Sequence, residues 1–205
     1  DQFTVTYQGG YTVDTILDNP KGVKVIGPLR PCIGIAVTDS KKLVTLHKHS
    51  SNSLDSLANI LKENLNLAEP KDLYARIYTI QDDVEWAQNG RTAMHGGKTH
   101  REAVIDIRDC LEQLGFLRSN IPYGLKNLRD TKTKKFIYEE GALGRYESAE
   151  LCVAVRLNKL FVEKQGKKQI QCFSIDPFEA DVLKYKGTHI TQAENAGSNL
   201  PMYQK

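Results

Sequence analysis

Several features that would assign a function class at once are missing from this 205-residue sequence. Its four cysteines, at positions 32, 110, 152 and 172, have no CxxC spacing, which argues against a zinc ribbon and a dense disulfide framework and favours reduced thiols. No apolar run approaches membrane-spanning length, so we expect no membrane partner. Net charge is only +3 and charges of both signs are interspersed, so we expect no nucleic-acid partner.

The remaining composition is that of an ordinary soluble globular protein. Hydrophobic residues make up 40% and charged residues 26% of the chain, which at this length predicts a single domain with its own core. We place that domain at residues 1–186 and a polar tail at 187–205. No basic-then-apolar signal begins the chain, so we expect a cytoplasmic protein, or one delivered to a host cytosol if it is an effector.

A hairpin over residues 31–49 is the most informative stretch. Residues 32–37 are short, apolar and rich in β-branched side chains, and residues 43–49 alternate like a strand after a polar turn. The turn centre near 39–41 puts Cys32 opposite residues 47 to 49. A thiol beside an imidazole is the minimum equipment of a nucleophilic cysteine. Alternation places His47 and His49 on the same face, so it does not choose between them.

Elsewhere the pattern predicts an α+β protein. Its two main helices are expected over about 53–66, where leucines recur at helical spacing, and from a capping box at Thr99 to Leu114. The other expected elements are strands at 2–7, 23–26, 73–80, 135–139, 151–163 and 169–175, a weaker strand or helical turn at 11–17, a long loop at 81–98 and a short helix at 177–185. We expect bent β-sheets forming a sandwich-like core with the two helices packed outside.

The order of these elements resembles a known superfamily over about residues 23–116. The chain has a cysteine at a strand start and a histidine fifteen residues later, at the end of the next strand. Gly96-Gly97 then precedes a helix that ends at Leu114-Gly115-Phe116. This series resembles that of the cysteine amidohydrolase superfamily. That superfamily includes the chemoreceptor glutamine deamidases, the catalytic domains of cytotoxic necrotizing factor toxins and N-terminal asparagine amidohydrolase. The β-rich part from about 120 to 176 would then be an extension that carries specificity.

The resemblance implies a role for particular residues. Cys32 would be the nucleophile and His47 the base, with His49 as the alternative base. A group on a neighbouring strand holds the imidazole in these families, and here the candidates for this orienting or oxyanion role are the backbones of Val25, Ile26 and Gly27. The implied reaction is deamidation of glutamine or asparagine on a protein substrate through a thioester, without a cofactor, as in toxins and effectors.

Other functions fit the same residues. One alternative is a non-catalytic protein-binding module, which would keep the scaffold with an inert cysteine. This alternative is motivated by Arg30-Pro31, because the resembled families have small residues before the cysteine. A cysteine peptidase or a transglutaminase are further alternatives. Burial explains the remaining cysteines better than chemistry does.

The loop at 81–98 carries weaker candidates. Trp86 and His95 are candidates for substrate contact, since amphipathic aromatic residues on loops often serve recognition. For Trp86 an equal alternative is that it anchors the loop to the body of the protein. Gly96-Gly97-Lys98-Thr99 lacks the first glycine of a phosphate-binding loop, whose position is Thr92. The acidic residues of this loop with its histidines do not form a convincing ligand set, so we expect no metal.

Overall fold

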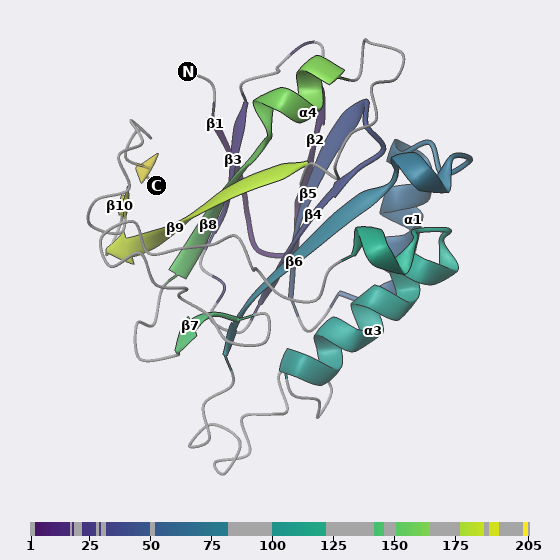
Figure 1. The fold of residues 1–205 in the computed structure, drawn as a ribbon. Coiled ribbons are helices and arrows are strands. Elements are labelled where there is room, and N and C mark those ends of the chain that lie inside the picture. Colours follow the sequence, from purple (N-terminus) through teal and green to yellow (C-terminus); the bar gives the residue numbers. More distant parts are fainter. Residues whose placement is uncertain are drawn as a thin grey trace.

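The computed structural model contains two β-sheets and a helical layer (Figure 1). It describes residues 3–16, 18, 22–27, 29, 32–49, 52–81, 100–121, 142–145, 151–164, 177–186, 189–192 and 203–204. The expected α+β class is confirmed.

Within the described residues, one sheet has six strands in the order β1-β3-β8-β9-β10-β11. Its strands are β1 (Phe3–Thr6), β3 (Val23–Ile26), β8 (Leu151–Leu157), β9 (Phe178–Lys186), β10 (His189–Gln192) and β11 (Tyr203–Gln204). The pair β1 and β3 is parallel, and the other pairs are antiparallel. The last two short strands lie in the expected polar tail.

The second sheet has five described strands in the order β2-β5-β4-β6-β7. They are β2 (Tyr11–Thr15), β5 (Lys42–Lys48), β4 (Ile33–Thr38), β6 (Tyr74–Gln81) and β7 (Ala142–Arg145). The central pair, β4 and β5, is the hairpin expected from the sequence, and its register runs from Thr38 opposite Leu43 to Ile33 opposite Lys48.

The turn of this hairpin is fixed by its own polar side chains. The buried Asp39 carboxylate accepts the amides of Lys41 and Lys42 at 2.9 and 2.8 Å and the amide of Asn66 at 2.9 Å. Ser40 adopts a positive φ of 71° and donates its hydroxyl to the Asp72 carbonyl at 2.8 Å. The Ser40 amide donates to the Thr38 hydroxyl at 3.0 Å. Because side chains of the turn accept these amides, the register of β4 on β5 is fixed at this end.

Two helices cover the outer face of the five-stranded sheet, as Figure 1 shows. The first, α1 (Leu54–Asn64), begins where Ser53 accepts the Ser56 amide at 3.0 Å. The second, α3 (His100–Gln113), ends before Gly115, whose φ of 105° suits only glycine. Two 3-10 turns lie at Pro70–Asp72 and Arg118–Asn120, and a short helix α4 at Lys159–Lys164.

The five-stranded sheet separates two apolar clusters. Between it and the helices lie Ile33, Ile35, Val37, Val44, Leu46, Leu57, Leu61, Ile107 and Leu111 with their neighbours. Between the two sheets lie Ile26, Leu29, Cys32, Ala36, Leu43, Tyr78, Val153, Val155, Phe161 and Phe178. Alternate residues of β4 therefore face opposite clusters, and the two sheets pack face to face as expected for a sandwich-like core.

Two expectations for the second half were wrong. The strand expected to run to residue 163 ends at Leu157, because the Asn158 side chain accepts the Leu160 amide at 2.9 Å and starts α4, which buries Phe161. The helix expected over 177–185 is instead β9, which pairs along the whole of β8. Burial of Phe178 in the inter-sheet cluster selects the strand over local helix preference.

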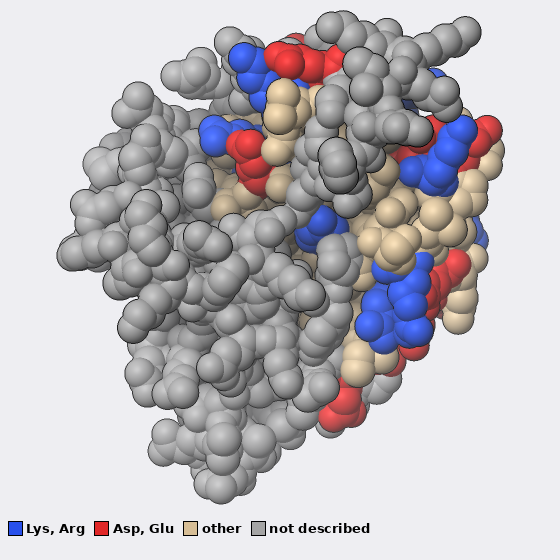
Figure 2. All heavy atoms as spheres, viewed as in Figure 1, with Lys and Arg blue, Asp and Glu red and all other residues tan. Residues whose placement is uncertain are grey.

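Other expectations fall outside the described residues. These are most of the loop at 81–98, the capping box at Thr99, and the strands at 135–139 and 169–175. Among the helices that are described, none is long and apolar enough to cross a membrane. On the face shown in Figure 2, basic and acidic side chains of the described residues are mixed rather than gathered by sign.

An ion pair joins the two sheets. Lys24 of β3 contacts the carboxylate of Asp14 of β2, and the lysine side chain is 1% exposed whereas that of Asp14 is 24% exposed. A lysine ammonium withdrawn from water needs such a partner, because its desolvation costs several kcal/mol. The pair therefore fixes β2 against β3 where the two sheets meet.

We expect the two single substitutions of this pair to differ. Asp14→Ala leaves a buried ammonium without its carboxylate and should lower the free energy of unfolding by about 3–5 kcal/mol. Lys24→Met leaves a carboxylate that water reaches, so its cost should be roughly 0–2 kcal/mol. Urea unfolding followed by circular dichroism measures both, with the exposed Asp18→Ala as control. Equal losses for the two variants would contradict the asymmetry.

Candidate functional site

Cys32 lies immediately before β4 and faces the space between the two sheets. Its side chain is 1% exposed and belongs to the inter-sheet cluster. The ladder of β4 and β5 ends with Ile33 opposite Lys48, so the next residues outward, Cys32 and His49, are opposite one another. The sequence prediction that Cys32 lies opposite residues 47 to 49 is confirmed.

His47 lies on β5, opposite Gly34, and faces the same side as Cys32. The two residues are diagonal neighbours across the strand pair, a relation in which residues are about 7–8 Å apart. The imidazole is 2% exposed and lies against Gly27, where an added Cβ would be 3.5 Å from Cε1. The site is therefore enclosed between the sheets rather than displayed on a surface.

The backbone carbonyl of Thr6 orients the imidazole. Its oxygen lies 3.1 Å from His47 Nδ1 and also accepts the Gly27 amide at 3.2 Å. A carbonyl only accepts hydrogen bonds, so Nδ1 carries a proton, and in the neutral form of the ring the lone pair is on Nε2. This is the tautomer that a general base acting through Nε2 needs.

The orienting carbonyl therefore comes from β1 and not from Val25, Ile26 or Gly27. Strand β3 lies between β1 and β8, so Val25 and Ile26 pair with both neighbours and their backbone groups serve the two ladders. Gly27 lies beside the ring and contributes through its amide, which donates to the Thr6 carbonyl. The group nearest His47 Nδ1 is thus a backbone carbonyl, as the sequence prediction assumed, but it belongs to Thr6, which that prediction did not name.

The side chain of Thr6 explains why its carbonyl is so placed. Its hydroxyl lies 2.8 Å from the Thr45 hydroxyl, which in turn lies 2.6 Å from the Thr12 hydroxyl. These bonds join β1, β5 and β2 at Thr45, two residues before His47 on β5. Hydroxyls both donate and accept, so the three satisfy one another in a buried position. The end of β1 is thereby fixed against β5 at the level of the imidazole.

The environment of the Cys32 thiol is mainly apolar. Burial raises the pKa of Cys32 to about 11, and the positive charge of Lys48 opposes that rise. The thiol is therefore protonated at neutral pH in the free protein.

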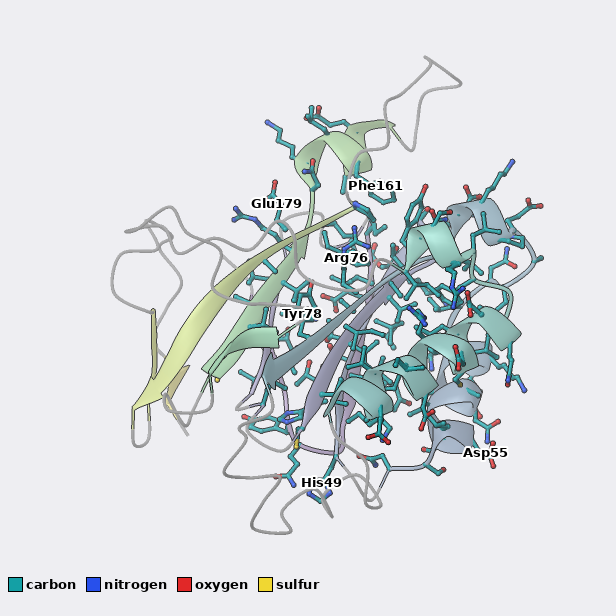
Figure 3. The ribbon with its side chains drawn as sticks, turned by 60° about the horizontal axis from the view of Figure 1, so that its bottom comes forward. His49, Asp55, Arg76, Tyr78, Phe161 and Glu179 are labelled. Carbon is teal, nitrogen blue, oxygen red and sulfur yellow. The ribbon has the colours of Figure 1, made fainter. Side chains whose placement is uncertain are left out.

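His49, the alternative base, ends the hairpin. Figure 3 shows it at the opposite end of the molecule from Phe161 of α4. Its amide donates to the Asn52 side chain at 2.9 Å and its carbonyl accepts the Asn52 amide at 3.0 Å, so the backbone turns here. Its side chain is half-buried, whereas that of His47 is buried and oriented by a carbonyl. Of the two candidate bases, His47 is therefore the one whose ring is held by a backbone carbonyl.

The remaining expected site residues differ in how far they are described. Cys152 is fully buried in β8, as expected of a core residue, and Cys110 on α3 donates towards the Leu54 carbonyl at 3.8 Å. Cys172, Trp86 and His95 lie outside the described residues. Within the part of the chain that the structure describes, no group of three or more potential ligands gathers as a metal site.

No protein-family model matches this sequence, and no curated protein matches it at a significant level.

Two glycines near the site should respond differently to alanine. A Cβ on Gly34 would lie 3.1 and 3.2 Å from Ile26 Cδ1 and Leu29 Cδ1, closer than packed carbons normally approach, whereas at Gly27 the nearest atoms are 3.5 Å away or more. We expect Gly34→Ala to lower the free energy of unfolding by about 1–3 kcal/mol and Gly27→Ala to change it by less than about 1 kcal/mol. Urea unfolding of both variants measures these changes. A larger loss of unfolding free energy for Gly27→Ala than for Gly34→Ala would refute the prediction.

The Cys32 thiol should be slow to alkylate in the folded protein. With its pKa raised from 9.0 to about 11, the thiolate fraction near neutral pH is roughly a hundredfold smaller than in the unfolded chain. Mass spectrometry of peptides after timed iodoacetamide treatment, native and in urea, measures the ratio. The same rate in both states would contradict this environment.

Proposed function

We propose that this chain is a cysteine-dependent amidohydrolase that deamidates a glutamine or asparagine side chain on a protein substrate. The observation that carries the proposal is that Cys32 and His47 share one face of a strand pair while the Thr6 carbonyl holds the imidazole with Nδ1 protonated. A nucleophile, a base and a group that orients the base are the parts of a nucleophilic site.

The chemistry follows from these positions. As Cys32 Sγ attacks the carboxamide carbon, Nε2 of His47 takes the thiol proton, and the imidazolium returns that proton to the departing nitrogen. The carbon–nitrogen bond breaks, ammonia leaves and a thioester remains. Water, activated by the same Nε2, attacks the thioester, and the products are a carboxylic acid and the restored thiol. An amine in place of water would give transglutamination.

Burial of Cys32 determines how the first step proceeds. Because the pKa of Cys32 is raised to about 11, the thiol is protonated in the free enzyme. Proton transfer to His47 must therefore accompany the attack of the sulfur on the carboxamide carbon. The hydrogen bond to the Thr6 carbonyl then contributes more to the rate of this step, since it aligns Nε2 and stabilises the imidazolium as it forms. The pair would operate more like a serine–histidine pair than a preformed thiolate–imidazolium pair.

A non-catalytic binding module is the second candidate function. It is favoured by one observation, the almost complete burial of a thiol with a raised pKa, because inert structural cysteines have this environment. In that case His47 and the threonine hydroxyls serve only to join the sheets.

Substitution of the pair decides between these functions. We expect Cys32→Ser to abolish amide-to-acid conversion and ammonia release, and His47→Gln to lower kcat by roughly 10²–10⁴-fold, the usual worth of a positioned base. The assay is a pool of glutamine- and asparagine-containing protein fragments, followed by mass spectrometry and an ammonia measurement.

The control is Cys110→Ser, which removes a thiol on the far side of the five-stranded sheet and should leave the rate unchanged. Conversion that persists in Cys32→Ser at the rate of the unmodified protein would refute the assignment. Absence of conversion by the unmodified protein across the pool would favour the binding module.

A further inference from the structure

We infer that Thr45 is a positioning residue for His47: its buried hydroxyl holds Thr6 so that the carbonyl of Thr6 meets the imidazole. In this role Thr45 acts through Thr6 and not on the reacting atoms. The catalytic meaning of the inference rests on the proposed function, whereas the hydrogen bonds on which it depends are present whether or not the chain is an enzyme.

Thr45 places a hydroxyl against the inter-sheet cluster. Alternation along β5 puts Leu43, Thr45 and His47 on the side of that cluster, while Val44 and Leu46 face the helices. Thr45 is 0% exposed. A buried hydroxyl costs free energy unless it is hydrogen-bonded, and a valine would fill nearly the same space without that cost. The hydroxyl at this position is therefore explained by the bonds that it makes.

Thr6 is bonded to β5 at two points. Its hydroxyl lies 2.8 Å from the Thr45 hydroxyl, and its carbonyl oxygen lies 3.1 Å from His47 Nδ1. Thr45 and His47 are two residues apart on one face of the strand, which separates their Cα atoms by about 6.5–7 Å. Thr6 spans this interval, with its side chain at one point and its carbonyl at the other.

These two bonds restrict the backbone of Thr6. A threonine side chain is branched at Cβ and has few rotamers, so the position of its hydroxyl largely sets the orientation of its own backbone. Because the Thr6 hydroxyl is held at Thr45, turning the Thr6 carbonyl away from the imidazole would strain or break that bond. The Gly27 amide, which donates to the same carbonyl at 3.2 Å, holds it from the side of β3.

The backbone of His47 is held by a different set of bonds. Its amide donates to the Gly10 carbonyl at 3.0 Å, and its carbonyl accepts the Gly9 amide at 2.8 Å. Neither bond involves a threonine hydroxyl. Loss of the Thr45 hydroxyl should therefore leave β5 in place and change mainly how firmly the ring of His47 is held.

Thr12 ends the series of hydroxyls. Its hydroxyl lies 2.6 Å from that of Thr45 and 3.4 Å from that of Thr6, and its side chain is half-buried. A hydroxyl has one proton to donate, so Thr45 can donate to one of the two threonines and accept from the other. Because the contact between Thr12 and Thr6 is long, Thr12 acts on Thr6 mainly through Thr45.

Exchange of the His47 Nδ1 proton with water, measured by NMR of the ¹⁵N-labelled chain at one fixed pH, tests the inference. Thr45→Val removes the hydroxyl and nearly keeps the shape, and should speed this exchange by roughly three- to tenfold, the usual effect of one hydrogen bond. Thr45→Ser keeps the hydroxyl, so its rate should be closer to that of the unmodified protein than to that of Thr45→Val. Thr12→Val should speed exchange less than Thr45→Val does.

Thr38→Val is the matched control. Thr38 is another buried threonine of the same hairpin, and its hydroxyl donates to the Lys42 carbonyl at 2.6 Å and accepts the Ser40 amide at 3.0 Å. Its replacement should lower the urea midpoint about as much as Thr45→Val does and leave exchange at His47 unchanged, because these bonds lie at the far end of the β4–β5 ladder. Equal acceleration of exchange in Thr38→Val and Thr45→Val would show a general loosening and would overturn the inference.

An exchange rate in Thr45→Val equal to that of the unmodified protein would also overturn it. If circular dichroism shows that Thr45→Val does not fold, Thr6→Val removes the same bond from its other partner and is read in the same way.

The activity assay adds a separate readout. Thr45→Val should lower kcat for amide conversion about as much as it speeds exchange, with KM unchanged, because Thr45 acts on the base and not on substrate binding. Absence of amide conversion by the unmodified protein would count against the proposed function alone, and the exchange rates would still decide the role of Thr45.

Discussion

The hydrogen bond between His47 Nδ1 and the Thr6 carbonyl connects the fold of this protein with its proposed chemistry. It crosses from the five-stranded sheet to the six-stranded sheet. Hydrogen bonds among the threonine hydroxyls of β1, β5 and β2 join these strands near it, and the Gly27 amide donates to the same carbonyl oxygen. If the end of β1 moved, the imidazole would lose both its tautomer and its alignment with Cys32.

The sandwich supplies what this bond requires. Two layers of apolar packing hold β4 and β5 from both sides, so a polar pair can be kept at their end with little freedom. The same packing buries the thiol and raises its pKa. The positive charge of Lys48 opposes that rise, and in the proposed reaction the transfer of the thiol proton to His47 would avoid a free thiolate.

Local patterns in the sequence predicted those elements whose structure depends on neighbouring residues in the chain. The hairpin, its register, α1 and α3 follow from alternation, a polar turn and leucine spacing, and the pairing of Cys32 with residues 47 to 49 follows from the hairpin alone. Thr6 was missed because its role depends on a parallel pairing with β3, which no local pattern reveals. β9 was missed because its strand form depends on pairing with β8, and the raised pKa of Cys32 depends on burial by distant strands.

The most direct test of the central claim is the tautomer of His47. A long-range proton–nitrogen correlation spectrum of uniformly ¹⁵N-labelled protein near neutral pH distinguishes the two ring nitrogens. The structure predicts a proton on Nδ1, protected from exchange by the bond to the Thr6 carbonyl. A ring protonated on Nε2, or one that exchanges rapidly between the two forms, would contradict the orienting role of Thr6 and with it the proposed base.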